Sequence, residues 1–299
     1  MTLQKDLPYN LRCMKENRQK DKKGWIALDI DGTITLDKYS VPQPVIDYLG
    51  SLSRSGWRIA LATGRPYAFA SMALSKFDFP YVFLVQNGSA GLEMPGAKPL
   101  FKNYLSPRVL RTVEEAYEGI DSDFLVYAGY EKGDYCYWRP QRLSKDDLDY
   151  LGDLQKRQKE VWRRVESFDA VKDDFPLIKC FGPSARMKIV SDRLKASGLF
   201  QVATIRDPFH ENYQILLVTD KAVSKGEALK KVFQKMGRGK RVIGAGDDEN
   251  DLSLLEVADI KIAMSHAPQF LQEKADLIAP PTQDCGIIHA LQMGIDASR

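Results

Sequence analysis

The sequence has few cysteines and no long apolar run. Its four cysteines (Cys13, Cys136, Cys180 and Cys285) lie far apart and form no CxxC pair, so neither a zinc site nor a disulfide framework is indicated. No apolar stretch approaches the roughly 20 residues that a membrane-spanning helix needs, and the N-terminus lacks the apolar segment of a secretory signal. We therefore expect reduced thiols and a cytoplasmic protein that does not contact a membrane.

Positive and negative side chains are also nearly balanced over most of the chain. Residues 1–23 carry seven Lys/Arg against three Asp/Glu, a balance of +4, whereas the whole chain carries +3. The remainder is close to neutral, which argues against a nucleic-acid-binding face, because such faces concentrate Lys and Arg. We interpret residues 1–23 as a basic, solvated N-terminal arm.

The two ends of the chain show the alternation of apolar runs and helical stretches that is typical of a parallel sheet. Buried strands are predicted at 25–30, 58–63, 81–87 and 241–246. Helices are predicted at about 43–55, after the second strand up to about residue 76, and at 224–236. At 299 residues the chain is long enough for two domains. The fold class expected is α/β, with a Rossmann-like, doubly wound parallel sheet as the core, formed by residues 24–90 and 219–299.

Residues 91–218 have a different pattern and predict an inserted α+β cap domain. FLVYAGYEKGDYCYWR (124–139) contains two β-prone runs around an EKGD turn, which indicates an antiparallel hairpin. Ser144 and Asp147 resemble a capping box that opens a charged helix running to about Phe168. LIKCFG and YQILLV are further strand candidates.

Carboxylates gather at the predicted strand ends of the core. The first strand ends in Asp29-Ile30-Asp31-Gly32-Thr33, and the run 246–251 (GDDEND) follows a late strand. Ligands bind at the carboxyl ends of strands in open parallel sheets, so the two acidic segments should converge there. Crowded carboxylates repel one another unless a cation lies between them, and oxygen ligands suit Mg²⁺.

Anion-binding groups are predicted at the same edge of the sheet. Thr63-Gly64-Arg65 ends the second strand, and Lys225 starts a late helix. A hydroxyl, turn amides and an ammonium beside a metal can neutralise a phosphoryl group, whose transfer depends mostly on positioning and electrostatics. A carboxylate nucleophile would form an acyl phosphate, which a second carboxylate can help water to break.

With four motifs in order, DIDGT (29–33), ATGR (62–65), SKG (224–226) and GDDEND (246–251), the sequence resembles the haloacid dehalogenase-like (HAD) hydrolases, and within them the Cof-type sugar-phosphatase-like group with a large α+β cap. The resemblance covers nearly everything after Gly24. It implies that Asp29 is the nucleophile and that Asp31 is the acid that protonates the leaving group and then activates water. It also implies a set of binding residues: Asp29, the Asp31 carbonyl and Asp247 for Mg²⁺; Thr63, Gly64, Arg65, Lys225 and Asn250 for the phosphoryl group; and Asp251 to steady Lys225 or the metal shell.

The function predicted is Mg²⁺-dependent hydrolysis of a small phosphate monoester, with a sugar phosphate as the expected kind of substrate. A phosphosugar mutase on the same scaffold and a catalytically silent phosphate-binding protein are the alternatives, since fold alone does not guarantee activity.

His266 stands where the family usually has Asn, and we do not expect it to be a general base, because the aspartate pair fills both proton-transfer roles. Arg139, Lys188 and Arg206 are candidate substrate contacts from the cap. The oligomeric state and the substrate are not indicated.

Overall fold

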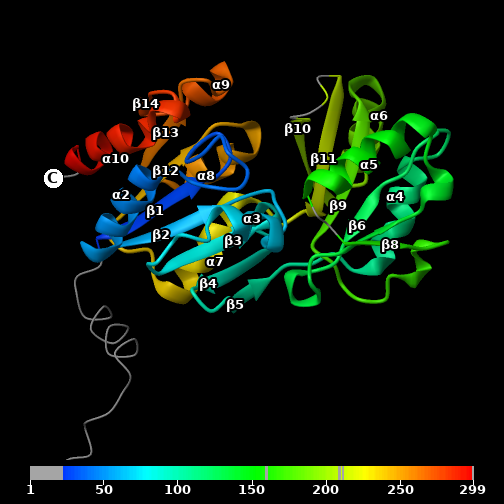
Figure 1. Ribbon diagram of the computed structural model, residues 1–299, viewed down its shortest axis with the longest axis horizontal. Helices are drawn as coiled ribbons and strands as arrows, with labels where there is room; N and C mark the ends of the chain where they lie inside the picture. The colour runs from blue at the N-terminus through cyan, green and yellow to red at the C-terminus, as the bar shows by residue number, and fades with distance from the viewer. Residues whose placement is uncertain (1–22, 159–160, 208–209, 211, 298–299) are drawn as a thin grey trace, which may run out of the picture.

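The computed structural model describes residues 23–158, 161–207, 210 and 212–297, which form two β-sheets in neighbouring bodies (Figure 1). The predicted basic arm, apart from Lys23, lies outside the described residues. The larger sheet has the strand order β14 (Leu277–Ala279), β13 (Ile260–Met264), β12 (Arg241–Gly246), β1 (Gly24–Asp29), β2 (Trp57–Ala62), β3 (Tyr81–Val85), β4 (Ala90–Met94) and β5 (Lys98–Lys102). Its first six strands pair in parallel, and the last two form an antiparallel extension.

Helices cover both faces of the larger sheet. They are α2 (Gln43–Arg54), α3 (Tyr67–Ala73), α7 (Lys225–Met236), α8 (Leu252–Val257), α9 (Gln269–Gln272) and α10 (Gly286–Asp296), with short 3₁₀ turns η1 (Gln86–Gly88), η6 (Glu249–Asp251) and η7 (Thr282–Asp284). Alternate residues of β1 show the division: Ile26 and Leu28 pack with α2 and α10, whereas Trp25 and Ala27 pack with α7 and α8. Because side chains alternate across a strand, an almost uninterrupted apolar run fits a sheet that is buried on both faces.

The smaller sheet forms the cap. Its strand order is β10 (Phe200–Arg206), β11 (Tyr213–Asp220), β9 (Leu177–Pro183), β6 (Leu125–Tyr127), β7 (Cys136–Trp138) and β8 (Trp162–Arg164). Helices α4 (Leu110–Ala116) and α6 (Ser184–Ala196) pack on one face, and α5 (Lys145–Gln158) packs on the other. The remaining turns are η2 (Pro107–Val109), η3 (Tyr130–Lys132), η4 (Pro140–Arg142) and η5 (Phe168–Ala170). The predicted fold class, a doubly wound α/β core with an α+β cap, is confirmed.

The first predicted boundary of the cap needs correction. Residue 91 was placed at the start of the cap, but β4 and β5 pair with β3 and so extend the core sheet to Lys102. The Gly and Pro residues of this segment indicate a break in the helix-strand alternation, and the break is a hairpin within the same sheet. The cap therefore begins after Lys102.

The predicted charged helix also ends earlier than expected. It was predicted to run to about Phe168, but α5 ends at Gln158 and β8 follows within four residues. Trp162 packs edge-on against Trp138 of β7, at 5.3 Å between ring centroids, and the Cys136 amide donates to the Val161 carbonyl. The contact between these half-buried tryptophans and the pairing with β7 favour a strand here over continuation of the helix.

Two expectations on composition can be compared with the described residues. Cys136, Cys180 and Cys285 are free thiols, and Cys13 lies outside the described part of the chain. Among the described helices, none is long and apolar enough to cross a membrane.

Candidate active site

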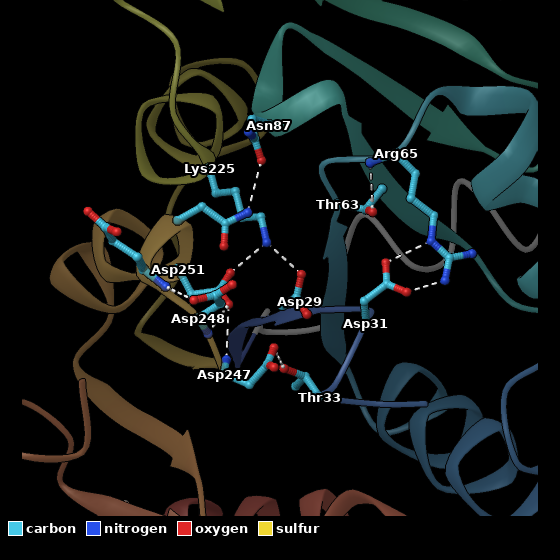
Figure 2. Close-up of polar contacts among 12 residues, drawn as sticks. Asp29, Asp31, Thr33, Thr63, Arg65, Asn87, Lys225, Asp247, Asp248 and Asp251 are labelled. Atoms are coloured by element: carbon cyan, nitrogen blue, oxygen red, sulfur yellow. Dashed lines mark hydrogen bonds and ion pairs between the residues drawn. The ribbon is translucent and has the colours of Figure 1, made fainter. Parts of the chain in front are cut away.

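The carboxyl ends of β1 and β12 bring two acidic segments together. Asp29 is the last residue of β1, and Asp247 follows β12, the parallel neighbour of β1. The ends of parallel strands lie at the same edge of a sheet, so the two carboxylates meet there although the chain separates them widely. Figure 2 shows Asp29, Asp247, Asp251 and Lys225 grouped around this edge.

Lys225 is held between two carboxylates at the start of α7. The Ser224 hydroxyl accepts a hydrogen bond from the Glu227 amide at 3.1 Å, which caps the helix and makes Lys225 its first residue. The buried ammonium donates to Asp29 Oδ1 at 2.5 Å and to Asp251 Oδ1 at 2.6 Å (Figure 2). Burial by itself lowers the pKa of Lys225, but the Asp251 and Asp29 carboxylates more than offset this and raise that pKa above its ordinary value. The side chain therefore stays charged.

Asp251 organises the loop after β12. Its Oδ1 accepts from Lys225, and its Oδ2 accepts from the amides of Asp247 and Asp248 at 3.0 and 3.1 Å. The second of these contacts closes a capping box with Asp248 at the start of η6. Both oxygens of Asp251 already have donors, so this residue positions Lys225 and the loop.

The Asp247 carboxylate contacts two polar side chains and lies close against Gly32. The Thr33 hydroxyl donates to its Oδ1 at 3.3 Å, and His266 Nε2 lies 3.3 Å from its Oδ2. A Cβ atom at Gly32, which has φ +80°, would lie only 2.1 Å from the same Oδ2, so this position needs glycine for space as well as for backbone conformation. Burial, followed by the charge of Asp251, raises the pKa of Asp247 to about 6.

The donor set of this cluster fits a hard divalent cation. Oxygens of Asp29, Asp247 and Asp251 all lie within 4.8 Å of one another, and because Asp251 already accepts from Lys225 and two amides, Asp29 and Asp247 are the candidate ligands. Asp29 Oδ2 is buried and has no hydrogen-bond partner among the described residues. Burial, together with the charges of Asp251 and Asp247, raises the pKa of Asp29 well above its usual range. Three carboxylates around one ammonium leave excess negative charge, and Mg²⁺ with its preference for oxygen ligands would offset it.

Asp31 lies apart from this cluster and is paired with Arg65. The Arg65 Nε donates to Asp31 Oδ2 at 2.7 Å, and Arg65 Nη2 donates to Asp31 Oδ1 (Figure 2). The guanidinium also donates to the Lys38 carbonyl at 2.6 Å and lies over the Phe69 ring, 4.5 Å from its centroid. Arg65 pairs with Asp31 because a planar guanidinium matches a carboxylate in a two-bond arrangement. The role predicted for Arg65 in binding the phosphoryl group stays a prediction.

The other predicted phosphate-binding residues line the same edge of the sheet. The Thr63 side chain is buried, and its hydroxyl accepts a hydrogen bond from the Arg65 amide at 3.1 Å. The Asn250 side chain donates to Asn87 Oδ1 at 3.1 Å. A Cβ atom at Gly64 would lie 2.9 Å from Leu217 Cδ1 of the cap, so the glycine allows the core and the cap to approach closely.

A cavity of about 360 Å³ lies where the core faces the cap. The polar cluster forms one side of this cavity and the cap sheet forms the other. The core supplies Asp29, Asp31, Lys38, Gly64, Arg65, Pro66, Phe69, Lys225, Asp247, Asp248, Asn250 and Asp251, and the cap supplies Tyr127, Leu154, Leu177, Lys179, Ile205, Asp207, Ile215 and Leu217. The core side is rich in charged groups and the cap side is mostly apolar with two charged residues, Lys179 and Asp207. Such a cavity is typical of a site that orients a small polar ligand.

Comparison with known proteins agrees with this arrangement. The sequence profile of the haloacid dehalogenase-like hydrolases matches residues 26–291. The chain belongs to this family.

Two relatives and one solved structure match most of the length of this HAD-like hydrolase. It is 29% identical over 268 residues to a phosphoglycolate phosphatase of Archaeoglobus fulgidus, covering 89% of this chain and 95% of the relative. It is 22% identical over 280 residues to a 5-amino-6-(5-phospho-D-ribitylamino)uracil phosphatase of Bacillus subtilis, covering 89% and 96%. A solved HAD subclass IIB sugar phosphatase has the same fold, with a TM-score of 0.70 at 18% identity, covering 90% of this chain and 98% of that one. The predicted Cof-type resemblance and the predicted enzyme class, a phosphoric monoester hydrolase, are confirmed.

The cap contacts of this HAD-like hydrolase differ from those expected. Arg139 is buried in an ion pair with Asp123, at 2.8 Å, which gives it a structural role inside the cap. Lys188 is exposed on α6 and paired with Asp192. The Arg206 side chain lies outside the described structure.

Sequence reasoning missed Lys179, which lines the cavity from β9. The signal was present in the segment LIKCFG, where one lysine interrupts an apolar strand.

Proposed function

We propose that this protein is a Mg²⁺-dependent phosphatase that hydrolyses a small phosphate monoester through an aspartyl-phosphate on Asp29. The observation that carries the proposal is the buried Asp29–Lys225–Asp251 arrangement, in which Asp29 Oδ2 has no partner among the described residues. An anionic nucleophile held beside a fixed ammonium suits attack on phosphorus, because the ammonium offsets the negative charge of the phosphoryl group.

The reaction divides into two displacements at phosphorus. In the first, a carboxylate oxygen of Asp29 bonds to phosphorus as the bond to the leaving oxygen breaks, and the acid form of Asp31 protonates that oxygen. In the second, the Asp31 carboxylate takes a proton from water, whose oxygen attacks phosphorus and releases inorganic phosphate and the Asp29 carboxylate. For both steps Asp31 has to leave its pair with Arg65 and turn toward the substrate.

The neighbouring residues bind and orient the phosphoryl group. We assign Lys225, the Thr63 hydroxyl and Asn250 to its oxygens, while Asp251 keeps Lys225 in place. Asp29, Asp247 and the carbonyl of Asp31 would hold Mg²⁺, which would supply positive charge that balances the phosphoryl group and the carboxylates. The cap closes the cavity and limits the access of water to the acyl phosphate.

The test is phosphate release from a panel of esters, with Mg²⁺ and with a chelator. The panel contains sugar phosphates, p-nitrophenyl phosphate, and the two compounds named for the relatives, phosphoglycolate and 5-amino-6-(5-phospho-D-ribitylamino)uracil. Asp29→Asn should abolish release. Asp192→Asn, the same change at an exposed site on α6, should not.

Folding and chemistry can be separated in this experiment. Burial disfavours the charge on Asp29, so the metal-free Asp29→Asn protein should be at least as stable as the wild type. Release that survives in Asp29→Asn would contradict the proposal. Release that requires a bisphosphate activator would favour a mutase.

A further inference from the structure

Lys179 is a charged residue at the centre of the apolar cap sheet. It lies on β9, between Leu217 of β11 and Leu125 of β6 in the strand register. Its strand neighbours on the same face, Leu177 and Phe181, belong to the apolar cluster that includes α5. Figure 1 shows β9 and β11 on the side of the cap that is nearer to the core.

The Lys179 side chain is largely buried and has no partner among the described residues. It is 7% exposed and lines the cavity between the core and the cap. Among the described residues it forms no hydrogen bond or ion pair. Its ammonium is accessible from the cavity and has no anion of the protein beside it, so an anion that enters the cavity would be a favourable partner.

Asp207, the acidic residue that the cap contributes to the cavity, is not paired with Lys179. Asp207 lines the same cavity, but its Oδ2 accepts from the Tyr150 hydroxyl at 2.6 Å and its Oδ1 accepts from the His210 amide at 2.9 Å. No ion pair joins it to Lys179 in the described structure. Two of the three lysines that line the cavity therefore differ: Lys225 in the core contacts two carboxylates, whereas Lys179 in the cap contacts none among the described residues.

We propose that Lys179 binds a second anionic group on the leaving-group part of the substrate. This inference rests on the proposed function, because Lys225 and its neighbours take the phosphoryl group to be transferred. The substrate class is then a small phosphate ester that carries a carboxylate or a second phosphate at its other end. A cavity of about 360 Å³ admits a compound of that size, and the leucine and isoleucine side chains of the cap contact its carbon chain.

The experiment compares pairs of esters that differ in the second anion. 3-Phosphoglycerate and glycerol 3-phosphate test a carboxylate, and fructose 1,6-bisphosphate and fructose 6-phosphate test a second phosphate. For one of the two pairs, the wild type should prefer the doubly anionic member by roughly 10- to 100-fold in kcat/KM, the range expected for a charged hydrogen bond. The pair that shows the preference identifies the anion.

The variant Lys179→Met then tests the residue. Methionine has a similar length and fits the apolar surroundings, so the melting temperature should not fall. The kcat/KM ratio within the preferred pair should drop to about one, mainly through a higher KM for the doubly anionic ester. Lys188→Met, the same change at an exposed position, should keep the wild-type ratio.

Two results would overturn the inference while leaving the proposed function intact. One is wild-type turnover without preference in either pair. The other is a Lys179→Met protein that loses activity toward both members equally, as a structural role would cause. Absence of phosphate release from every ester, p-nitrophenyl phosphate included, would instead refute the proposed function and the inference with it.

Discussion

Replacing Gly32 with alanine should disable the proposed metal site and leave the fold intact. Gly32 has φ +80°, and a Cβ atom there would lie 2.1 Å from Asp247 Oδ2 and 2.5 Å from Asp247 Cγ. Ordinary contacts begin at 3.4 Å, so the Asp247 carboxylate has to move by roughly 1 Å. The backbone around Gly32 is anchored by its amide, which donates to the Thr35 carbonyl at 2.8 Å, so the carboxylate moves more readily than the turn.

The expected size of the effect has two parts. An alanine in the left-handed region costs about 1–2 kcal/mol in folding free energy, which lowers the melting temperature by roughly 2 to 4 °C. A catalytic group displaced by about 1 Å can cost on the order of 100-fold in rate. The loss of activity should therefore greatly exceed the loss of stability.

Gly119→Ala is the matched control for this substitution. Gly119 has φ +74°, and a Cβ atom there would meet nothing within 4 Å, so the variant carries the backbone strain without the clash. Thermal unfolding should show similar melting temperatures for the two variants. Calorimetric titration with Mg²⁺ should show weakened binding only in Gly32→Ala, and the phosphatase assay should show a loss only there. Equal Mg²⁺ affinity in the two variants would refute the reasoning.

Three further predictions concern the cluster and the contact between core and cap. Lys225→Met leaves Asp29 and Asp251 buried without their shared ammonium, and chemical denaturation should show a loss of about 3–5 kcal/mol; an unchanged midpoint would contradict it. Mg²⁺ at 100 times its Kd should stabilise the protein by about 2.7 kcal/mol, seen as a melting temperature that a chelator lowers again. Asp134→Ala removes the acceptor of the Ala68 amide, at 2.5 Å, where the cap touches the start of α3; a loss of about 1 kcal/mol is expected, and no change in melting temperature would argue against this contact.

Most of the core could be predicted because its signals are local. β12 occupies the predicted residues 241–246, and α7 begins after Ser224, whose capping bond is a short-range contact. Apolar runs buried on both faces indicate parallel strands without any knowledge of their neighbours. The hairpin at 124–139 was also predicted correctly, since Gly133 adopts the left-handed conformation that its turn needs.

The parts predicted wrongly depend on distant partners. β8 is a strand because β7 lies beside it and Trp138 packs on Trp162, and neither contact can be read from the charged segment itself. Similarly, β4 and β5 look like a departure from the core pattern, yet they complete the core sheet by pairing with β3.

The candidate site divides in the same way between local and distant information. The motifs place Asp29, Lys225 and Asp247 at strand ends and a helix start, so topology alone brings them together. The partner of Arg65 is different, because a side chain of that length reaches either the phosphoryl position or Asp31, and only the three-dimensional arrangement decides between them. The role of a residue such as Lys179 is harder still to predict from the sequence, because it depends on which face of β9 lines the cavity. Residues that choose the substrate are therefore expected to escape motif analysis wherever, as in this cap, they lie on strands that belong to a separate sheet.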